Sequence, residues 1–510
     1  MTFFPPSARR FLGVLLPLGL FIRLGFIFVG ARLVYPGADG SWKCGDTFSF
    51  IWSWENLWLH GRYTFDFLEP DAAFGRLPGY PLFYGLHYLL FGAANAIRAT
   101  QISQALLDTL AIAMAFGIGR RLAPTSRWAP YLAALVYCFN PFPITWISII
   151  STECLATILT VTWAYVLLAG TGGRWNAVVV ALVIVAAFYV REYLGFFLPL
   201  SALYWLLKAR RERGAGTHAW LGVPVSALRA GTVATVVFLA LYSLWPIRNY
   251  ALQHRVVLVK TKTAGYALFN TDYYAFRGWV LCWATDVDPL VPIVSHGRQL
   301  NYPAAAHLTP AQRAEADRGT RLAYQCGSSF WLDRNKVYGN KTGRYRDTTW
   351  MRAQTAYWNH CNDSVAAPFD RLRAAYIRDY PLEYWFRVPL LTLREAIIYN
   401  PYFGKGLGPL SLYQLFFALA AAARSVLLGL AFLLCWRQRA ETVPLVGFAI
   451  CMMLMLSFLI RFIEFRYMLQ ADALLLLVVA AGLAPLLDRF SGASAPVVPA
   501  APYQAALPVQ

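Results

Sequence analysis

Acidic and basic side chains gather where the apolar segments of this chain begin or end. Asp46 lies in GDTFSFIWSWENLW, Glu153 lies in ISTECLAT, and Arg76 precedes LPGYP. Other charged residues at such boundaries are Arg191, Glu192, Arg248, Lys260, Lys262, Arg461, Glu464 and Arg466. A carboxylate in a partly desolvated cleft can act as a general base, and arginine and lysine stabilise phosphate groups. These residue types predict proton abstraction next to a phosphate.

Each of these residues also has an ordinary structural interpretation. Asp46 shares its loop with several other acids that water would solvate. Glu153 follows Ser151-Thr152 and could be a favourable charge in the first turn of a helix. The arginines could be interfacial anchors whose side chains reach the lipid headgroups. The meeting of acids and bases at one membrane face is therefore a hypothesis that the fold must test.

The composition points to a membrane protein. Of the 510 residues, 58% are apolar and only 14% are charged, with a net charge of +19. A soluble domain carries about 25% charged residues. The values exclude a disordered chain, a small disulfide scaffold and an ordinary soluble enzyme. Nucleic acid is not needed to explain the positive charge, because basic loops on one side of a membrane account for much of it.

Long apolar runs predict about ten or more membrane spans in a mainly α-helical, polytopic fold. We expect spans near residues 11–29, 98–119, 128–147, 152–170, 175–190, 193–207, 228–246, 409–435, 443–460 and 467–487. Clusters of Lys and Arg in the short loops, such as KARRER, then fall on one side, which the positive-inside rule makes cytoplasmic. We expect both termini on that side and an uncleaved first span.

The predicted membrane spans divide the chain into four parts. Residues 1–246 form an N-terminal membrane module with a functional first loop at 30–97, and residues 247–408 form a soluble domain of α or mixed structure outside the cytoplasm. Residues 409–488 are C-terminal membrane helices, and 489–510 are a disordered tail rich in Ala and Pro. The run from Pro81 to Phe91 is too short to cross, so we expect an interfacial or re-entrant helix there.

Cysteines and short motifs narrow the chemistry further. Four cysteines lie outside the cytoplasm, where disulfides can form, and we expect a bridge between Cys326 and Cys361. Asp286-Val-Asp288 has the pattern of a metal-binding DxD motif but lacks its context, so a solvated turn is the better interpretation. No metal or other cofactor is required by the residue pattern, and no cluster of ligands supports a divalent metal.

Four segments in order resemble the membrane glycosyltransferases of the GT-C class, in particular the bacterial relatives of protein O-mannosyltransferases and of the lipid A aminoarabinose transferase. They are GDTFSFIWSWENLWLHGRY, RLPGYPLFYGLHYLLFG, WPIRNYALQHRVVLVKTKTAGYALF and RYMLQADALLLLVVAAGL. The resemblance implies inverting transfer of a sugar from a polyprenyl-phosphate donor on the periplasmic or extracellular side. The acceptor would be a glycolipid, a polysaccharide or a protein. Gly-Asp-Thr replaces the Asp-Glu pair of the protein mannosyltransferases, which makes a protein acceptor less supported.

By this resemblance Asp46 is the catalytic base and Glu153 is the second acid. The donor phosphate would be bound by Arg76, Arg248, Lys262 and Arg466. We expect the substrate cavity to include Tyr80, Arg191, Glu192, Tyr250 and Tyr467. The expected location is the inner membrane of a bacterium, with the lipid bilayer itself contributing to donor binding.

Two other classes of function fit many membrane spans and basic residues. One is a flippase or other transporter of lipid-linked saccharides, which would place ionisable residues near the midplane and show repeated halves. The other is a non-catalytic scaffold for assembly of the cell envelope. Clustering of the acids at one face beside a large soluble loop favours the enzyme.

Overall fold

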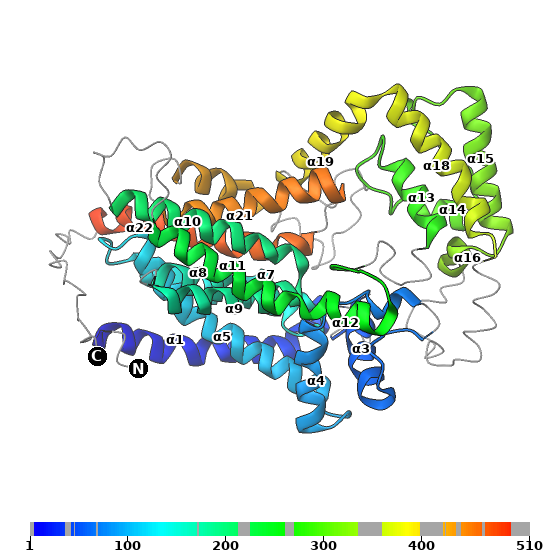
Figure 1. The fold of residues 1–510 in the computed structure, drawn as a ribbon. Helices are drawn as coiled ribbons and strands as arrows, with labels where there is room; N and C mark the ends of the chain where they lie inside the picture. The colour runs from blue at the N-terminus through cyan, green and yellow to red at the C-terminus, as the bar shows by residue number, and fades with distance from the viewer. Residues whose placement is uncertain are drawn as a thin grey trace.

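The computed structural model is built from helices, as the sequence predicts (Figure 1). It describes residues 5–35, 42–44, 46–67, 70–170, 173–212, 225–260, 270–334, 360–397, 422–423, 425–434, 440–461 and 465–490. Lys262, much of the expected span at 409–435, and the expected tail after residue 490 lie outside these ranges. In the described ranges the mainly α, multi-pass membrane fold is confirmed.

The membrane bundle is assembled around α5, α8 and α22, which pack against one another. Its elements are α1 (Pro6–Gly25), η1 (Phe26–Gly30), α2 (Ala31–Val34), α5 (Ala96–Leu122), α6 (Ala129–Cys138), α7 (Pro141–Trp146), α8 (Thr152–Ala169), α9 (Arg174–Val190), η3 (Glu192–Phe196), α10 (Phe197–Glu212), α11 (Val225–Tyr242), α12 (Leu244–Gln253), α21 (Val443–Leu454), η8 (Met455–Ile460), η9 (Phe465–Met468) and α22 (Leu469–Phe490).

Six helices in the described part of the chain are long and apolar enough to cross a membrane. They are Pro6–Val34, Ala96–Leu122, Thr152–Ala169, Val225–Gln253, Val443–Ile460 and Arg466–Phe490, and the shorter apolar helices are Arg174–Val190 and Ser425–Leu434. The expectation of one continuous span at 128–147 is wrong. That run is divided into α6 and α7 at Asn140-Pro141, where the Asn140 side chain accepts a hydrogen bond from the Phe142 amide and starts a new helix.

The basic clusters meet at one end of the bundle. The backbone amide of Arg127 donates to Asp488, and the guanidinium of Arg211 pairs with Glu441 at 3.5 Å. Lys208 donates to the carbonyl at the end of α8, at Gly170. The basic loops therefore lie on one side, as the pattern of Lys and Arg predicts.

Two helices of the first loop, α3 (Thr47–His60) and α4 (Gly79–Phe91), lie crosswise at the opposite end of the bundle (Figure 1). The short η2 (Pro70–Ala73) stands between them. α3 ends at Gly61, whose φ of +68° favours glycine and turns the chain back. At Gly79 a Cβ atom would lie 2.6 Å from the backbone of Tyr189, so glycine lets α4 begin directly against α9.

The helix α4 has one buried face and one exposed apolar face, and its interfacial position stays a prediction. Its polar and aromatic side chains Tyr80 and His87 are buried against the protein, whereas a row of leucines is exposed. The exposed apolar residues of α4 are Leu82, Leu86, Leu89, Leu90 and Phe91. An apolar face turned away from the protein at the end of a membrane bundle fits the lipid interface.

The segment that the sequence predicts to be a soluble domain is helical in its described residues. It contains α13 (Thr271–Val280), α14 (Val291–Ser295), η5 (Ala304–Ala306), α15 (Pro310–Gln325), α16 (Ser329–Arg334) and α18 (Asn362–Asp379), and it continues through η7 (Glu383–Arg387) and α19 (Val388–Ile397) toward α21. α15 starts with a capping box between Thr309 and Gln312. Cys326 and Cys361, the pair expected from the sequence, form a disulfide that links the end of α15 to the start of α18.

Asp272 makes the stability of this domain depend on pH. Its carboxylate is fully buried and accepts hydrogen bonds from the amide and hydroxyl of Ser329, at 2.8 and 2.5 Å. Burial raises the pKa of Asp272 to about 6, although these hydrogen bonds oppose the change. Between about pH 4 and 6 the folded state therefore keeps a proton that the unfolded state has lost. The free energy of unfolding falls as pH rises through this window and remains lower above it.

We expect Asp272→Asn to remove this loss, which amounts to ~3 kcal/mol at most from the difference between the two pKa values. The amide is neutral at every pH, and its oxygen can still accept one of the two hydrogen bonds from Ser329. Thermal unfolding of the full chain, followed by tryptophan fluorescence from pH 4 to 7.5, measures how its stability depends on pH. The exposed Asp370 provides the matched control, Asp370→Asn. An unchanged pH dependence in Asp272→Asn would contradict the assignment.

A buried ion pair links the first span to α5. Arg23 of α1 and Asp108 of α5 are both 0% exposed, and two guanidinium nitrogens approach the same Asp108 oxygen at 2.6 Å. The Tyr137 hydroxyl donates to the other carboxylate oxygen of Asp108 at 2.7 Å. Charges inside a membrane bundle persist when they are paired and hydrogen-bonded in this way.

Candidate functional site

The candidate site lies at the end of the bundle that carries α3 and α4, and it begins with Asp46. Asp46 is the residue just before α3, a position from which an aspartate usually accepts a hydrogen bond from its own helix. Here the side chain makes no such bond. The backbone carbonyl of Asp46 accepts from Ser49 instead. The carboxylate is thereby available to partners from elsewhere in the chain.

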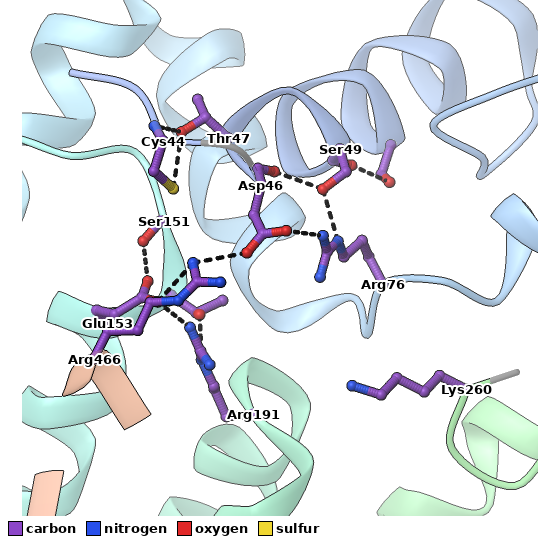
Figure 2. Close-up of polar contacts among 12 residues, drawn as sticks. Cys44, Asp46, Thr47, Ser49, Arg76, Ser151, Glu153, Arg191, Lys260 and Arg466 are labelled. Carbon is purple, nitrogen blue, oxygen red and sulfur yellow. Dashed lines mark hydrogen bonds and ion pairs between the residues drawn. The ribbon is translucent and has the colours of Figure 1, made fainter. Parts of the chain in front are cut away.

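Two arginines bind the two oxygens of the Asp46 carboxylate. Arg76 Nη2 lies 2.7 Å from Oδ1, and Arg466 Nη1 lies 2.8 Å from Oδ2 (Figure 2). Arg76 comes from the first loop, and Arg466 comes from η9, which directly precedes α22. Burial alone would raise the pKa of Asp46, but Arg76 and Arg466, with Arg191 further away, outweigh burial and hold that pKa well below its ordinary value.

Arg76 is held in place by more than the aspartate. Its Nε donates to the hydroxyl of Ser49 at 2.7 Å, and its guanidinium lies 4.7 Å from the centre of the Phe50 ring. Both partners are on the first two turns of α3. The first loop thus builds half of the site from residues close together in sequence.

Glu153 forms the second half of the site at the start of α8. Its carboxylate is fully buried and binds Arg191 and the hydroxyl of Ser151, and its Oε1 lies 3.4 Å from Arg466 Nη1. Arg191 also donates to the hydroxyl of Thr152. Arg466 therefore bridges the two carboxylates, and the cluster contains three guanidinium groups against two carboxylates (Figure 2).

A second ion pair lies next to this cluster. Glu192, the residue after Arg191, pairs with Lys260, which lies in the segment that leads into the soluble domain. Burial would raise the pKa of Glu192, but Lys260 and hydrogen bonds lower it to about 2. Figure 2 shows the Lys260 side chain pointing toward the space between Arg76 and Arg191. The sequence assigned Lys262 to the phosphate, and that residue lies outside the described ranges.

Arg248 is placed differently from the other predicted phosphate ligands. Its guanidinium donates to the backbone carbonyls of Ala73 and Tyr63, at 3.0 and 3.1 Å, and to the Asn249 side chain. These bonds attach α12 to the first loop rather than to the Asp46 carboxylate. Arg248 has the position of a structural residue that shapes the loop.

The three tyrosines predicted to line the cavity differ in their distance from the charged cluster. Tyr467 lies between Arg191 and Arg466, with its ring centre 5.3 Å from each guanidinium. Tyr80 is buried, and its hydroxyl donates to Gln104, so it supports the bundle. Tyr250 is 58% exposed on α12. Of these three, Tyr467 packs against the guanidinium groups of the charged cluster.

Several residues of the cluster were not singled out from the sequence. Ser49 lies three residues after Asp46, and Ser151 and Thr152 directly precede Glu153, so their proximity in sequence was a usable signal. Gln470 has no such signal. It sits on α22, accepts from the Tyr193 hydroxyl at 3.0 Å and lies 3.4 Å from the backbone carbonyl of Glu153.

A cavity of about 780 Å³ opens between the first loop, the start of α4 and α12. Aromatic and aliphatic side chains form most of its wall, among them Tyr63, Phe67, Leu82, Trp245 and Leu252, with Arg248 beside them. The Tyr63 hydroxyl donates to the backbone carbonyl of Arg76 at 3.1 Å. The cavity therefore adjoins the loop that carries Arg76, although Asp46 and Glu153 are not in its wall.

Metal ligands do not converge in the described residues, where no group of three or more His, Cys, Asp or Glu side chains could hold an ion. The DxD sequence forms a local turn in which Asp286 accepts from the Asp288 amide. What the site offers chemically is one partly exposed carboxylate, one fully buried carboxylate and three arginines.

Comparison with known proteins adds one finding. The family described as "PIG-U: GPI transamidase subunit PIG-U" matches residues 72–258, which is less than half of the chain. The match includes Arg76, Glu153 and Arg191 but ends before Arg466 and starts after Asp46. No curated protein is matched. The chain is therefore similar, from the first loop to α12, to a family of multi-pass membrane proteins.

Proposed function

We propose that the protein is an inverting glycosyltransferase of the GT-C type that uses a polyprenyl-phosphate sugar. The observation that supports this proposal is the carboxylate of Asp46 held between Arg76 and Arg466 at the membrane end that carries the interfacial helix α4. A lipid-linked donor would present its phosphate at this depth. Arginine pairs suit a phosphate, and a carboxylate suits the hydroxyl that attacks the sugar.

The reaction is a single displacement at the anomeric carbon. Asp46 accepts the proton of the acceptor hydroxyl as its oxygen bonds to that carbon. The bond between the carbon and the phosphate oxygen breaks, and the electron pair leaves with the polyprenyl phosphate. Arg76 and Arg466 stabilise the negative charge that develops on this leaving group. One base is sufficient for inversion, so the second carboxylate needs no covalent role.

Glu153 acts as a positioning residue in this scheme. It is fully buried and binds Arg191, Arg466 and Ser151, which leaves it poorly placed to take a proton from an acceptor. Its charge instead fixes two arginines in a site from which water is largely excluded. Such preorganised charges stabilise a transition state without further rearrangement.

The polyprenyl tail would lie along apolar surface next to the cluster. The cavity of about 780 Å³ is lined mainly by apolar side chains, and the exposed leucines of α4 continue that surface. An isoprenoid chain binds such a surface without hydrogen bonds. The bilayer and the protein would share the tail.

We propose that the site faces the periplasm or the extracellular side of a bacterial inner membrane. The basic clusters near Arg127, Lys208 and Arg211 meet at the other end of the bundle, and such clusters mark the cytoplasmic side. A glycolipid, a polysaccharide or a protein would then be the acceptor. Arg23 and Asp108 in the bundle interior pair with each other, which gives a transporter less support.

The family match favours a second candidate. PIG-U is described as a subunit of GPI transamidase, so a related chain could serve a complex that handles glycolipids without catalysing a reaction itself. In that case the charged cluster would bind a glycolipid phosphate, and Asp46 would have no chemical step to perform.

Purified full chain in lipid nanodiscs separates the two candidates. Radiolabelled polyprenyl-phosphate sugars and the corresponding nucleotide sugars are supplied with an envelope lipid extract as acceptor. We expect label to move from the lipid-linked donors alone. Use of nucleotide sugars would contradict the proposed donor. Binding of polyprenyl phosphate without any transfer would favour the non-catalytic subunit.

A further inference from the structure

We propose that Asp46 occupies the place that the donor phosphate takes when it binds, so that phosphate binding releases the carboxylate to act as the base. This inference rests on the proposed function for the role of Asp46 as a base. The exchange of one anion for another at the arginine pair stands on the geometry alone.

The arginine pair already binds an anion in the way that a phosphate would be bound. Each oxygen of the Asp46 carboxylate holds one guanidinium, at 2.7 Å to Arg76 and 2.8 Å to Arg466. A phosphate also presents several oxygens that can accept from two separate arginines. The Asp46 side chain is 27% exposed, whereas that of Glu153 is 0% exposed. An incoming anion can therefore approach the arginines on the side of Asp46 but not on the side of Glu153.

The arginines have anchors that would keep them in place after Asp46 leaves. Arg76 is bound to the Ser49 hydroxyl and lies against the Phe50 ring. Arg466 lies 3.4 Å from Glu153 and 5.3 Å from the centre of the Tyr467 ring. Both guanidinium groups therefore persist as a preformed anion site, and only the Asp46 side chain has to move.

Movement of the Asp46 side chain breaks no bond of the helix that follows. The carboxylate does not cap α3, and the bonds from Ser49 go to the backbone carbonyl of Asp46. Rotation about the side-chain bonds can therefore turn the carboxylate away from the arginines without unwinding α3. The bound arginines also hold the pKa of Asp46 below its ordinary value. Loss of both partners strengthens it as a base when the donor is in place.

Phosphate affinity in Asp46→Asn tests the exchange. The neutral amide competes less well for the arginines, so affinity for farnesyl phosphate, measured by calorimetry on the full chain in nanodiscs, should rise about tenfold or more. Inorganic phosphate should show a gain if the headgroup is sufficient, and a gain with farnesyl phosphate alone shows that the tail is also needed. Either result supports the exchange. Farnesol, which lacks the phosphate, should show no gain, and an equal gain with farnesol overturns the exchange.

Asp71→Asn is the matched control. Asp71 is an acid of the same loop, but it pairs with Arg255 at 2.6 Å and not with the arginine pair. This variant should bind farnesyl phosphate like the wild type. Unchanged or weaker binding in Asp46→Asn, or an equal gain in Asp71→Asn, overturns the inference. The gain should also disappear in the double variant Asp46→Asn with Arg76→Ala, and a gain that persists there overturns it too.

Kinetics separate failure of the exchange from failure of the proposed function. The pH profile of kcat reports groups in the substrate-bound enzyme, and the pH profile of kcat/KM reports groups in the free enzyme. If the exchange occurs, the fall at low pH lies at a higher pH in the kcat profile than in the kcat/KM profile. Coincident limbs in an active enzyme overturn the exchange and leave the glycosyltransferase intact. Tighter phosphate binding in Asp46→Asn by a protein that transfers no sugar supports the anion exchange and rejects the proposed function.

Discussion

Asp46→Asn is expected to lower the turnover number for sugar transfer by about a thousandfold, within the range of 10²–10⁴ typical of a lost general base. Asparagine has the size of aspartate and its amide oxygen can still accept from Arg76, so the fold should be kept. It cannot take the proton of an acceptor hydroxyl. Initial rates at saturating donor and acceptor measure the effect, since they report turnover apart from binding.

The Asp46 prediction has a matched comparison in Asp71→Asn, which removes one charge from the same loop without touching the arginine pair. That variant should turn over at the wild-type rate. Monodisperse elution in detergent and an unchanged melting temperature would show that Asp46→Asn is folded. Turnover by Asp46→Asn within a factor of ten of the wild type would remove Asp46 from the role of base.

Arg466→Gln is expected to lower kcat/KM by about a hundredfold or more, because one charge-assisted hydrogen bond contributes roughly 1.5–3 kcal/mol and Arg466 serves both carboxylates. Its loss also leaves Glu153 fully buried with Arg191 as its remaining cation. We therefore expect the free energy of unfolding to fall by ~3 kcal/mol, as for other broken buried ion pairs. Initial rates at low donor concentration and thermal unfolding measure the two effects.

Two further variants show whether geometry or charge matters at this position. Arg466→Lys keeps the charge, but a single ammonium cannot reproduce the fork by which a guanidinium spans two partners, so it should recover only part of the activity. Arg255→Gln removes a half-exposed arginine that pairs with Asp71, and it should leave transfer unchanged. Wild-type kcat/KM in Arg466→Gln would refute the role of Arg466 at the phosphate.

Hydropathy and the distribution of Lys and Arg were sufficient to predict the class of fold and the end of the bundle at which the basic loops meet. They depend on composition over long windows, which the membrane constrains strongly. The break between α6 and α7 was missed because Pro141 is a local feature inside a run that is apolar throughout. The capping box at the start of α15 is a local feature as well, because all of its parts lie within the four residues from Thr309 to Gln312.

The site was only partly predictable, for a different reason. Asp46, Arg76, Glu153, Arg191 and Arg466 were chosen from their positions at membrane boundaries, and the structure brings these five together. Arg248 has an equally suitable position in sequence, but Trp245 and Asn249 pack inward on α12 and turn it toward the backbone of the first loop. The rotation of a helix about its axis depends on tertiary packing that no short motif contains.

The contact between Arg466 and Asp46 joins residues that are 420 positions apart. During synthesis the first loop leaves the ribosome long before η9 and α22 exist. The anion site therefore remains incomplete until the final helix has been inserted and has packed against α5, α6 and α8. A chain that stops before residue 465 would retain Asp46, Arg76 and Glu153 but lack the residue that joins them. The charged cluster is thus incomplete throughout insertion, and completion of the last helix is the step that joins Asp46 to Arg466.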